Sequence, residues 1–108
     1  MDFDEYSEHA TKTAIYPDEY RILYPALGLC GEAGEVAEKI KKILRDNNGK
    51  MSDTQRVEVT RELGDVLWYL NAVARDIGVS LESVAMLNIA KLSSRNSRGT
   101  LQGSGDYR

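Results

Sequence analysis

Apolar residues recur every three or four positions through most of this chain, and the alternation typical of β-strands is nearly absent. Spacing of this kind gathers apolar side chains on one face of an α-helix. The sequence therefore predicts an all-α protein. Its 108 residues fit one domain, but a chain of this size is marginally stable unless its helices pack well or its subunits associate.

Capping residues and chain breaks divide the pattern into four predicted helices. Asp2 with Glu5 and Ser52 with Gln55 have the spacing of capping boxes, and Ser80 can cap a further helix. Short connections of this kind predict antiparallel neighbours and a four-helix bundle. The predicted helices cover about residues 2–14, the low twenties to 46, 52–77 and 80–96.

The helical pattern fades near residue 96. We expect a helical domain over residues 1–96 and a glycine-rich C-terminal tail over residues 97–108, which holds three of the nine glycines. The backbone N–H groups of such a tail can wrap a phosphate. A frayed terminus is the alternative that this composition leaves open.

Charge balance and cysteine content exclude several classes of protein. Fourteen basic and seventeen acidic residues give a net charge of −3, which argues against binding of duplex nucleic acid. One cysteine, Cys30, cannot form an intrachain disulfide, and this favours a reducing compartment. The acidic N-terminus is unlike a signal peptide, and no apolar run reaches the roughly 20 residues of a membrane span. We therefore expect a soluble cytoplasmic protein with no membrane partner.

Two pairs of acidic residues border the apolar faces of the two central helices. Glu32 and Glu35 are three residues apart on the second helix, and Glu62 and Asp65 are three apart on the third. If these helices pack by their apolar faces, the four carboxylates can converge. They would then repel one another unless a hard cation neutralises them, and oxygen ligands favour magnesium or manganese over zinc.

Each acidic pair taken alone can also be solvated surface. Glu35 is spaced to pair with Lys39 on an exposed helix face, and Arg61 is spaced to pair with Asp65. Because the pattern repeats on two helices, a metal site and a solvated surface are equally supported interpretations.

Three glycines lie beside the first acidic pair, although glycine costs roughly 1 kcal/mol at an interior helical position. They indicate that either a ligand or a packed neighbour approaches the helix backbone closely. The glycines are Gly28, Gly31 and Gly34.

Trp68 and Tyr69 follow the second acidic pair. Because adjacent helical residues face different ways, we expect one of them to pack in the core. The other can stack on a base.

The acids stand within two longer runs, which are GLCGEAGEV over residues 28–36 and ELGDVLWYL over 62–70, and a third run, NIAKLSSR, follows over 88–95. These runs resemble the MazG-like all-α nucleoside triphosphate pyrophosphohydrolases, whose pattern is EExxE followed by ExxD. The resemblance covers roughly residues 20–96. One position departs from it: Gly31 stands where the pattern has its first glutamate, which leaves open the residue that activates water.

The resemblance implies hydrolysis of ribo- or deoxyribonucleoside triphosphates to the monophosphate and pyrophosphate, with Mg²⁺ or Mn²⁺ as cofactor. It also implies a bundle-like MazG fold assembled as a homodimer or homotetramer, with sites near subunit contacts. In the absence of an acid at position 31, Glu35 is our candidate for the general base. The implied site residues are Glu32, Glu35, Glu62 and Asp65 for the metal, and Asn88, Lys91 and Arg95 for the triphosphate.

A second function stays open at this stage. The same helix faces can belong to a non-catalytic helical module that binds a nucleotide or a partner protein.

Overall fold

The computed structural model describes residues 1–108 and contains helices but no β-strand, which confirms the predicted all-α class. The first helix ends three residues before the predicted position, and the other boundaries agree within a residue or two. No helix combines the length and apolar character that a membrane span requires. The elements are α1 (Phe3–Thr11), the short 3-10 helix η1 (Asp18–Tyr20), α2 (Leu23–Asn47), α3 (Asp53–Asp76) and α4 (Leu81–Ser97).

Polar side chains fix where three helices begin. The Asp2 carboxylate accepts a hydrogen bond from the Glu5 N–H at 2.8 Å. Ser52 and Gln55 form the reciprocal capping box, in which each side chain bonds the backbone N–H of the other residue. Ser80 caps α4 through the N–H of Ser83. Each cap satisfies a backbone N–H that a helix start leaves unpaired, so local sequence determines these boundaries.

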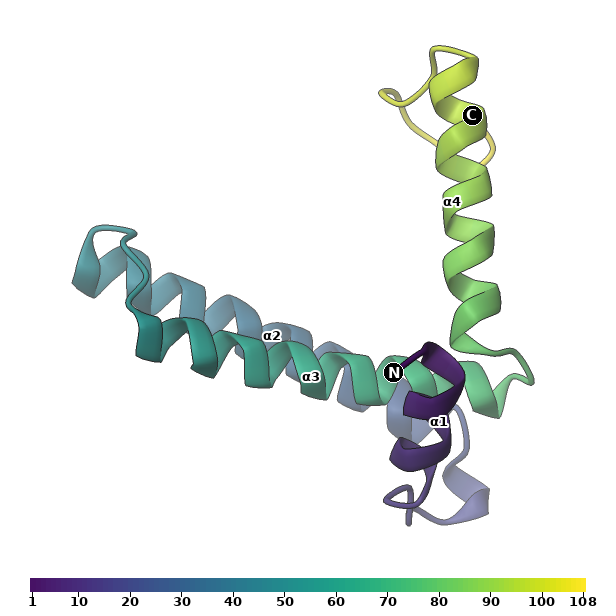
Figure 1. Cartoon of the computed structure of the whole chain (residues 1–108), viewed down its shortest axis with the longest axis horizontal. Helices are drawn as coiled ribbons and strands as arrows, with labels where there is room; N and C mark the ends of the chain where they lie inside the picture. The colour runs from purple at the N-terminus through teal and green to yellow at the C-terminus, as the bar shows by residue number, and fades with distance from the viewer.

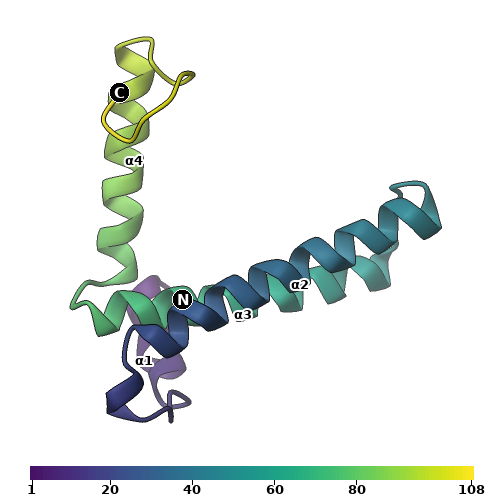
Figure 2. The ribbon, with the colours of Figure 1, turned by 180° about the vertical axis from the view of Figure 1, so that it is seen from behind.

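Helices α2 and α3 form a long antiparallel hairpin, which Figures 1 and 2 show from opposite sides. Asn48 and Gly49 make the turn in the left-handed region, with φ of 53° and 76°. Ile43 of α2 and Val59 of α3 are both buried in the half of the hairpin near the turn. On α2, Ile43 takes the buried position and its neighbour Leu44 is largely exposed.

Helix α4 leaves the end of α3 and points away from the hairpin (Figures 1 and 2). The radius of gyration is therefore 16.8 Å, against about 13 Å for a compact chain of this length. Only 8 of the 108 residues are buried. The four predicted helices are present, but they do not enclose a core within one chain.

Asp76, at the end of α3, holds the segment that enters α2. Its carboxylate accepts hydrogen bonds from the Tyr16 hydroxyl at 2.8 Å and the Ile22 N–H at 2.9 Å, and Arg21 lies 3.7 Å away. Ile22 has φ 68° and ψ −57°, the strained form of a γ-turn, closed by the Leu23 N–H on the Arg21 carbonyl. Such a conformation in a β-branched residue costs about 1–3 kcal/mol. The Asp76 bonds offset this cost and fix Tyr16 against the hairpin.

We predict that this contact weakens at high pH. Burial, the hydrogen bond to Asp76 and the Asp76 charge raise the pKa of Tyr16 from 10.0 to about 12. The stabilisation is complete below pH 10, where folded and unfolded chains both keep the phenol proton. It is lost as the pH rises through about 12.

Urea unfolding between pH 9 and 12 measures this loss. Tyr16→Phe should show a shallower fall in unfolding free energy than the wild type. Tyr107→Phe, which alters a fully exposed phenol, should follow the wild type. Equal slopes for Tyr16→Phe and the wild type would contradict the prediction.

Candidate metal centre

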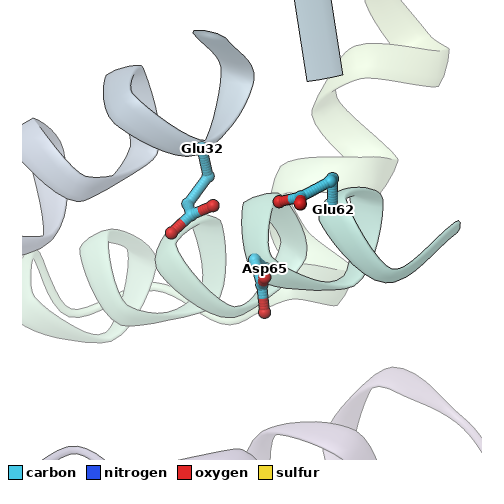
Figure 3. Close-up of side chains that lie close together, drawn as sticks. All are labelled: Glu32, Glu62 and Asp65. Atoms are coloured by element: carbon cyan, nitrogen blue, oxygen red, sulfur yellow. The ribbon is translucent and has the colours of Figure 1, made fainter. Parts of the chain in front are cut away.

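Three carboxylates from two helices meet where α2 faces α3. Figure 3 shows Glu32 coming from α2, with Glu62 and Asp65 coming from α3. Each offers one oxygen, and these oxygens all lie within 4.8 Å of one another. Glu32 and Glu62 are half-buried and Asp65 is exposed, so the cluster is open to solvent on one side. We call these three residues the acidic trio.

The charges of the acidic trio are incompletely balanced by the protein. The pKa of Glu32 is raised above its usual range by loss of hydration, then by Asp65, Glu62 and Glu35. One cation approaches, because the Lys39 ammonium lies 3.7 Å from the Glu62 carboxylate. Lys39 was expected to pair with Glu35 along its own helix, and it reaches across the hairpin instead.

The donor set of the acidic trio fits a hard divalent cation. It consists of oxygen atoms alone, which is what Mg²⁺ prefers over softer metals. Oxygens around an octahedral Mg²⁺ lie about 3–4 Å apart, so small side-chain rotations suffice to bring these carboxylates into range. The nearest lysine could move aside, since its ammonium sits at the outer limit of an ion pair.

Glu35, the fourth predicted ligand, lies outside the acidic trio. It lines a neighbouring charged groove of about 340 Å³ between α2 and α3, together with Glu38, Lys39 and Glu58. Its charge still reaches the site, because it contributes to the raised pKa of Glu32. The sequence pattern placed four acids together, and the structure gathers three of them with the fourth one helical turn away.

Only one of the three glycines on α2 meets a close neighbour. A Cβ atom on Gly28 would overlap the ring of Tyr69, which lies against the helix backbone there. Gly31 and Gly34 have no heavy atom within 4 Å of the corresponding position. Close packing therefore explains Gly28, and the other two leave an open face on α2.

An aromatic pocket of about 410 Å³ adjoins the acidic trio and includes Glu32 and Asp65 in its wall. Tyr16 stacks on Tyr24 with ring centroids 5.0 Å apart, and Trp68 meets Tyr69 edge to face at 4.9 Å. Tyr24 and Tyr69 join the two pairs at 6.5 Å. The other lining residues are Thr13 and Ile15.

Sequence reasoning identified part of this pocket. One of Trp68 and Tyr69 was expected to pack in the core, yet both are half-buried and line the same pocket. Tyr16 and Tyr24 were missed, because they flank a chain break where helical spacing carries no information. The signal that could have found them is the concentration of tyrosines at positions 16, 20 and 24.

The predicted phosphate-binding residues lie on α4 and are not brought to the acidic trio of their own chain (Figures 1 and 2). Asn88 and Lys91 are exposed. Arg95 is 7% exposed, and its guanidinium donates a hydrogen bond to the Asp106 carbonyl at 2.8 Å. Arg95 therefore holds the tail against α4, and its burial leaves little of the side chain accessible to a phosphate.

The tail folds back on the end of α4. Arg108 donates hydrogen bonds to the carbonyls of Thr100, Leu101 and Gly105. The tail thus closes on itself at the end of α4 that is remote from the acidic trio.

Comparisons with known proteins match most of the helical chain. The model of the MazG nucleotide pyrophosphohydrolase domain matches residues 24–99. The chain is similar to the Gene 37 protein of Mycobacterium phage L5, with 46% identity over an alignment of 114 residues that covers all of both chains. No solved structure matches the chain.

Proposed function

The chain belongs to the MazG nucleotide pyrophosphohydrolase family, and from this premise we propose that it hydrolyses nucleoside triphosphates to the monophosphate and pyrophosphate in the presence of Mg²⁺. Both ribo- and deoxyribonucleotides are within the proposal. Removal of triphosphates in this way would serve control of the nucleotide pool.

The convergence of Glu32, Glu62 and Asp65 carries this proposal. Three carboxylates within 4.8 Å of one another raise the free energy of the metal-free protein, and a cation relieves this repulsion. When bound, Mg²⁺ would neutralise triphosphate charge and orient the attacking water. Because α2 and α3 pack along their length, the ligands sit on rigid elements rather than on loops.

Glu35 is proposed as the general base. It lies one turn from Glu32 on α2, near the acidic trio but outside it, so its carboxylate is free to accept a proton from water. The open surface beside Gly31, where family members carry an acid, leaves room for that water. A positioned base of this kind contributes about 10²–10⁴ in rate.

We predict that kinetic measurements distinguish the metal-binding role of the acidic trio from the general-base role of Glu35. Asp65→Asn and Glu62→Gln should lose nearly all turnover and the dependence on Mg²⁺ concentration. Glu35→Gln should lose about 10²-fold or more in kcat while retaining metal binding. Pyrophosphate release from a panel of eight nucleotides, with Mg²⁺ and with EDTA, measures these effects.

Glu38→Gln provides the matched control, since it removes an exposed carboxylate that pairs with Lys41 on the same helix. It should keep turnover close to that of the wild type. Metal-dependent turnover by Asp65→Asn at the wild-type rate would refute the site. Nucleotide binding without hydrolysis of any nucleotide would favour a non-catalytic binding module.

We further propose that the working form is a homodimer or a larger homo-oligomer. The chain exposes 8002 Å², whereas a compact monomer of its mass exposes about 6,000 Å². The excess is more than the roughly 800 Å² per partner that a stable interface buries. Much of it is apolar, as in Met86, Leu87 and Ile89 on α4.

In such an assembly, α4 of one copy would supply Asn88 and Lys91 to the acidic trio of another. These two side chains are exposed and share a helix face with Arg95, and α4 cannot reach the trio of its own chain without moving as a whole (Figure 1). The lysine would balance charge on the outer phosphates.

Mixed oligomers test this sharing directly. Asp65→Asn and Lys91→Ala should each be nearly inactive, but co-refolded in equal amounts they should recover about a quarter of wild-type activity, because half of the dimers carry one intact site. Co-refolded Asp65→Asn and Glu62→Gln, which damage the same half of the site, should recover none. Absence of recovery in the first mixture, with mixed dimers present, would show that each site is built from one chain.

A further inference from the structure

The aromatic pocket shares two of its walls with the acidic trio. Glu32 and Asp65 line the pocket of Tyr16, Tyr24, Trp68 and Tyr69 and also offer oxygens to the trio. A ligand whose triphosphate lies at the carboxylates therefore has its other end beside aromatic rings. The pocket volume of about 410 Å³ is in the range of small-molecule sites.

Three polar side chains of the pocket are already engaged within the protein. The Trp68 ring N–H donates to the Thr13 hydroxyl at 2.8 Å, and that hydroxyl donates to the Ala10 carbonyl at 2.7 Å. The Tyr16 hydroxyl donates to Asp76 at 2.8 Å. These bonds fix the orientation of the rings and remove their polar atoms from contact with a ligand.

The lining contains none of the amide or cationic side chains that pair with base edges in bidentate patterns, namely asparagine, glutamine, arginine and lysine. Its two carboxylates belong to the acidic trio. The hydroxyl of Thr13 is already bonded to Trp68 and Ala10. What remains is aromatic surface, together with the hydroxyls of Tyr24 and Tyr69 close to the trio.

We propose that the aromatic pocket binds the nucleobase of the substrate by stacking, with Trp68 as the principal stacking residue, and that it selects bases by stacking area rather than by hydrogen bonding. This inference rests on the proposed hydrolysis of nucleoside triphosphates and adds the basis of its specificity. Stacking on an aromatic ring tolerates every base, because each base has a π-face. A site that hydrogen-bonds its substrate rejects analogues far more strongly, by about 10⁴ or more.

Trp68 is the only tryptophan of the chain, so its fluorescence reports on the pocket. The probes are α,β-methylene triphosphates of adenosine, guanosine, cytidine and uridine, which resist cleavage of the bond in question, and inorganic tripolyphosphate as the base-free control. With Mg²⁺ present, all four nucleotides should quench the emission and tripolyphosphate should not. Their dissociation constants should lie within about a hundredfold, with the purines tighter.

Two substitutions separate stacking from structural support. Trp68→Ala should weaken binding of the adenosine analogue about tenfold and leave tripolyphosphate binding unchanged, as measured by calorimetry. Trp68→Phe retains an aromatic face but loses the bond to Thr13, and it should bind the analogue within a few-fold of the wild type. Far-ultraviolet circular dichroism checks that both variants keep their helices.

Several results would overturn the stacking proposal while leaving hydrolysis intact. These are nucleotide binding without quenching, a spread among bases beyond about a hundredfold, tightest binding of a pyrimidine, or equal loss of nucleotide and tripolyphosphate binding in Trp68→Ala. If neither nucleotides nor tripolyphosphate bind, the proposed function fails as well. The tripolyphosphate arm therefore distinguishes loss of the base subsite from loss of the whole site.

Discussion

The antiparallel packing of α2 on α3 is the constraint on which the rest of the structure depends. It brings Glu32 from one helix to within 4.8 Å of Glu62 and Asp65 from the other. The same packing lays the Tyr69 ring against Gly28 and so forms the floor of the aromatic pocket. The proposed metal ligands and the proposed base-binding surface thus arise from one helix pair, and they lie side by side because they share Glu32 and Asp65.

A single chain leaves this arrangement incomplete. Helix α4 projects from the hairpin (Figure 2). Its apolar residues Met86, Leu87 and Ile89 are exposed. A chain that buries so few residues is expected to gain stability by association. If the partner's α4 also supplies Lys91, assembly and catalysis depend on the same contact. The tail, which Arg95 fixes, then caps the end of α4, the helix that makes this contact.

Much of the fold could be predicted from the sequence, because caps and periodicity act locally. Asp2, Ser52 and Ser80 marked helix starts that the structure has. The position of Glu35 could not be predicted. A spacing of three residues places Glu32 and Glu35 on one face of α2, but it does not say which of the two carboxylates meets the acids of α3. The roles of Asp76 and Tyr16 depend on a contact between residues 60 positions apart, which periodicity does not encode. The bond from Arg95 to the Asp106 carbonyl could not be predicted either, because a backbone carbonyl of the tail has no sequence signature.

The central claim is that the acidic trio is a cation site in which repulsion opposes folding until a cation binds. The pKa of Glu32 is raised in the folded chain, which means that its charged form is disfavoured there. The free energy of unfolding therefore falls as the pH rises from the pKa of Glu32 in the unfolded chain through its higher pKa in the folded chain. The most direct test is the melting temperature of Glu32→Gln at neutral pH, with and without Mg²⁺, beside Glu8→Gln as a surface control. We predict that Glu32→Gln melts a few degrees above the wild type without metal and gains little from Mg²⁺, whereas the wild type and Glu8→Gln gain by mass action. A metal-free Glu32→Gln that melts below the wild type, or gains as much from Mg²⁺, would contradict the account.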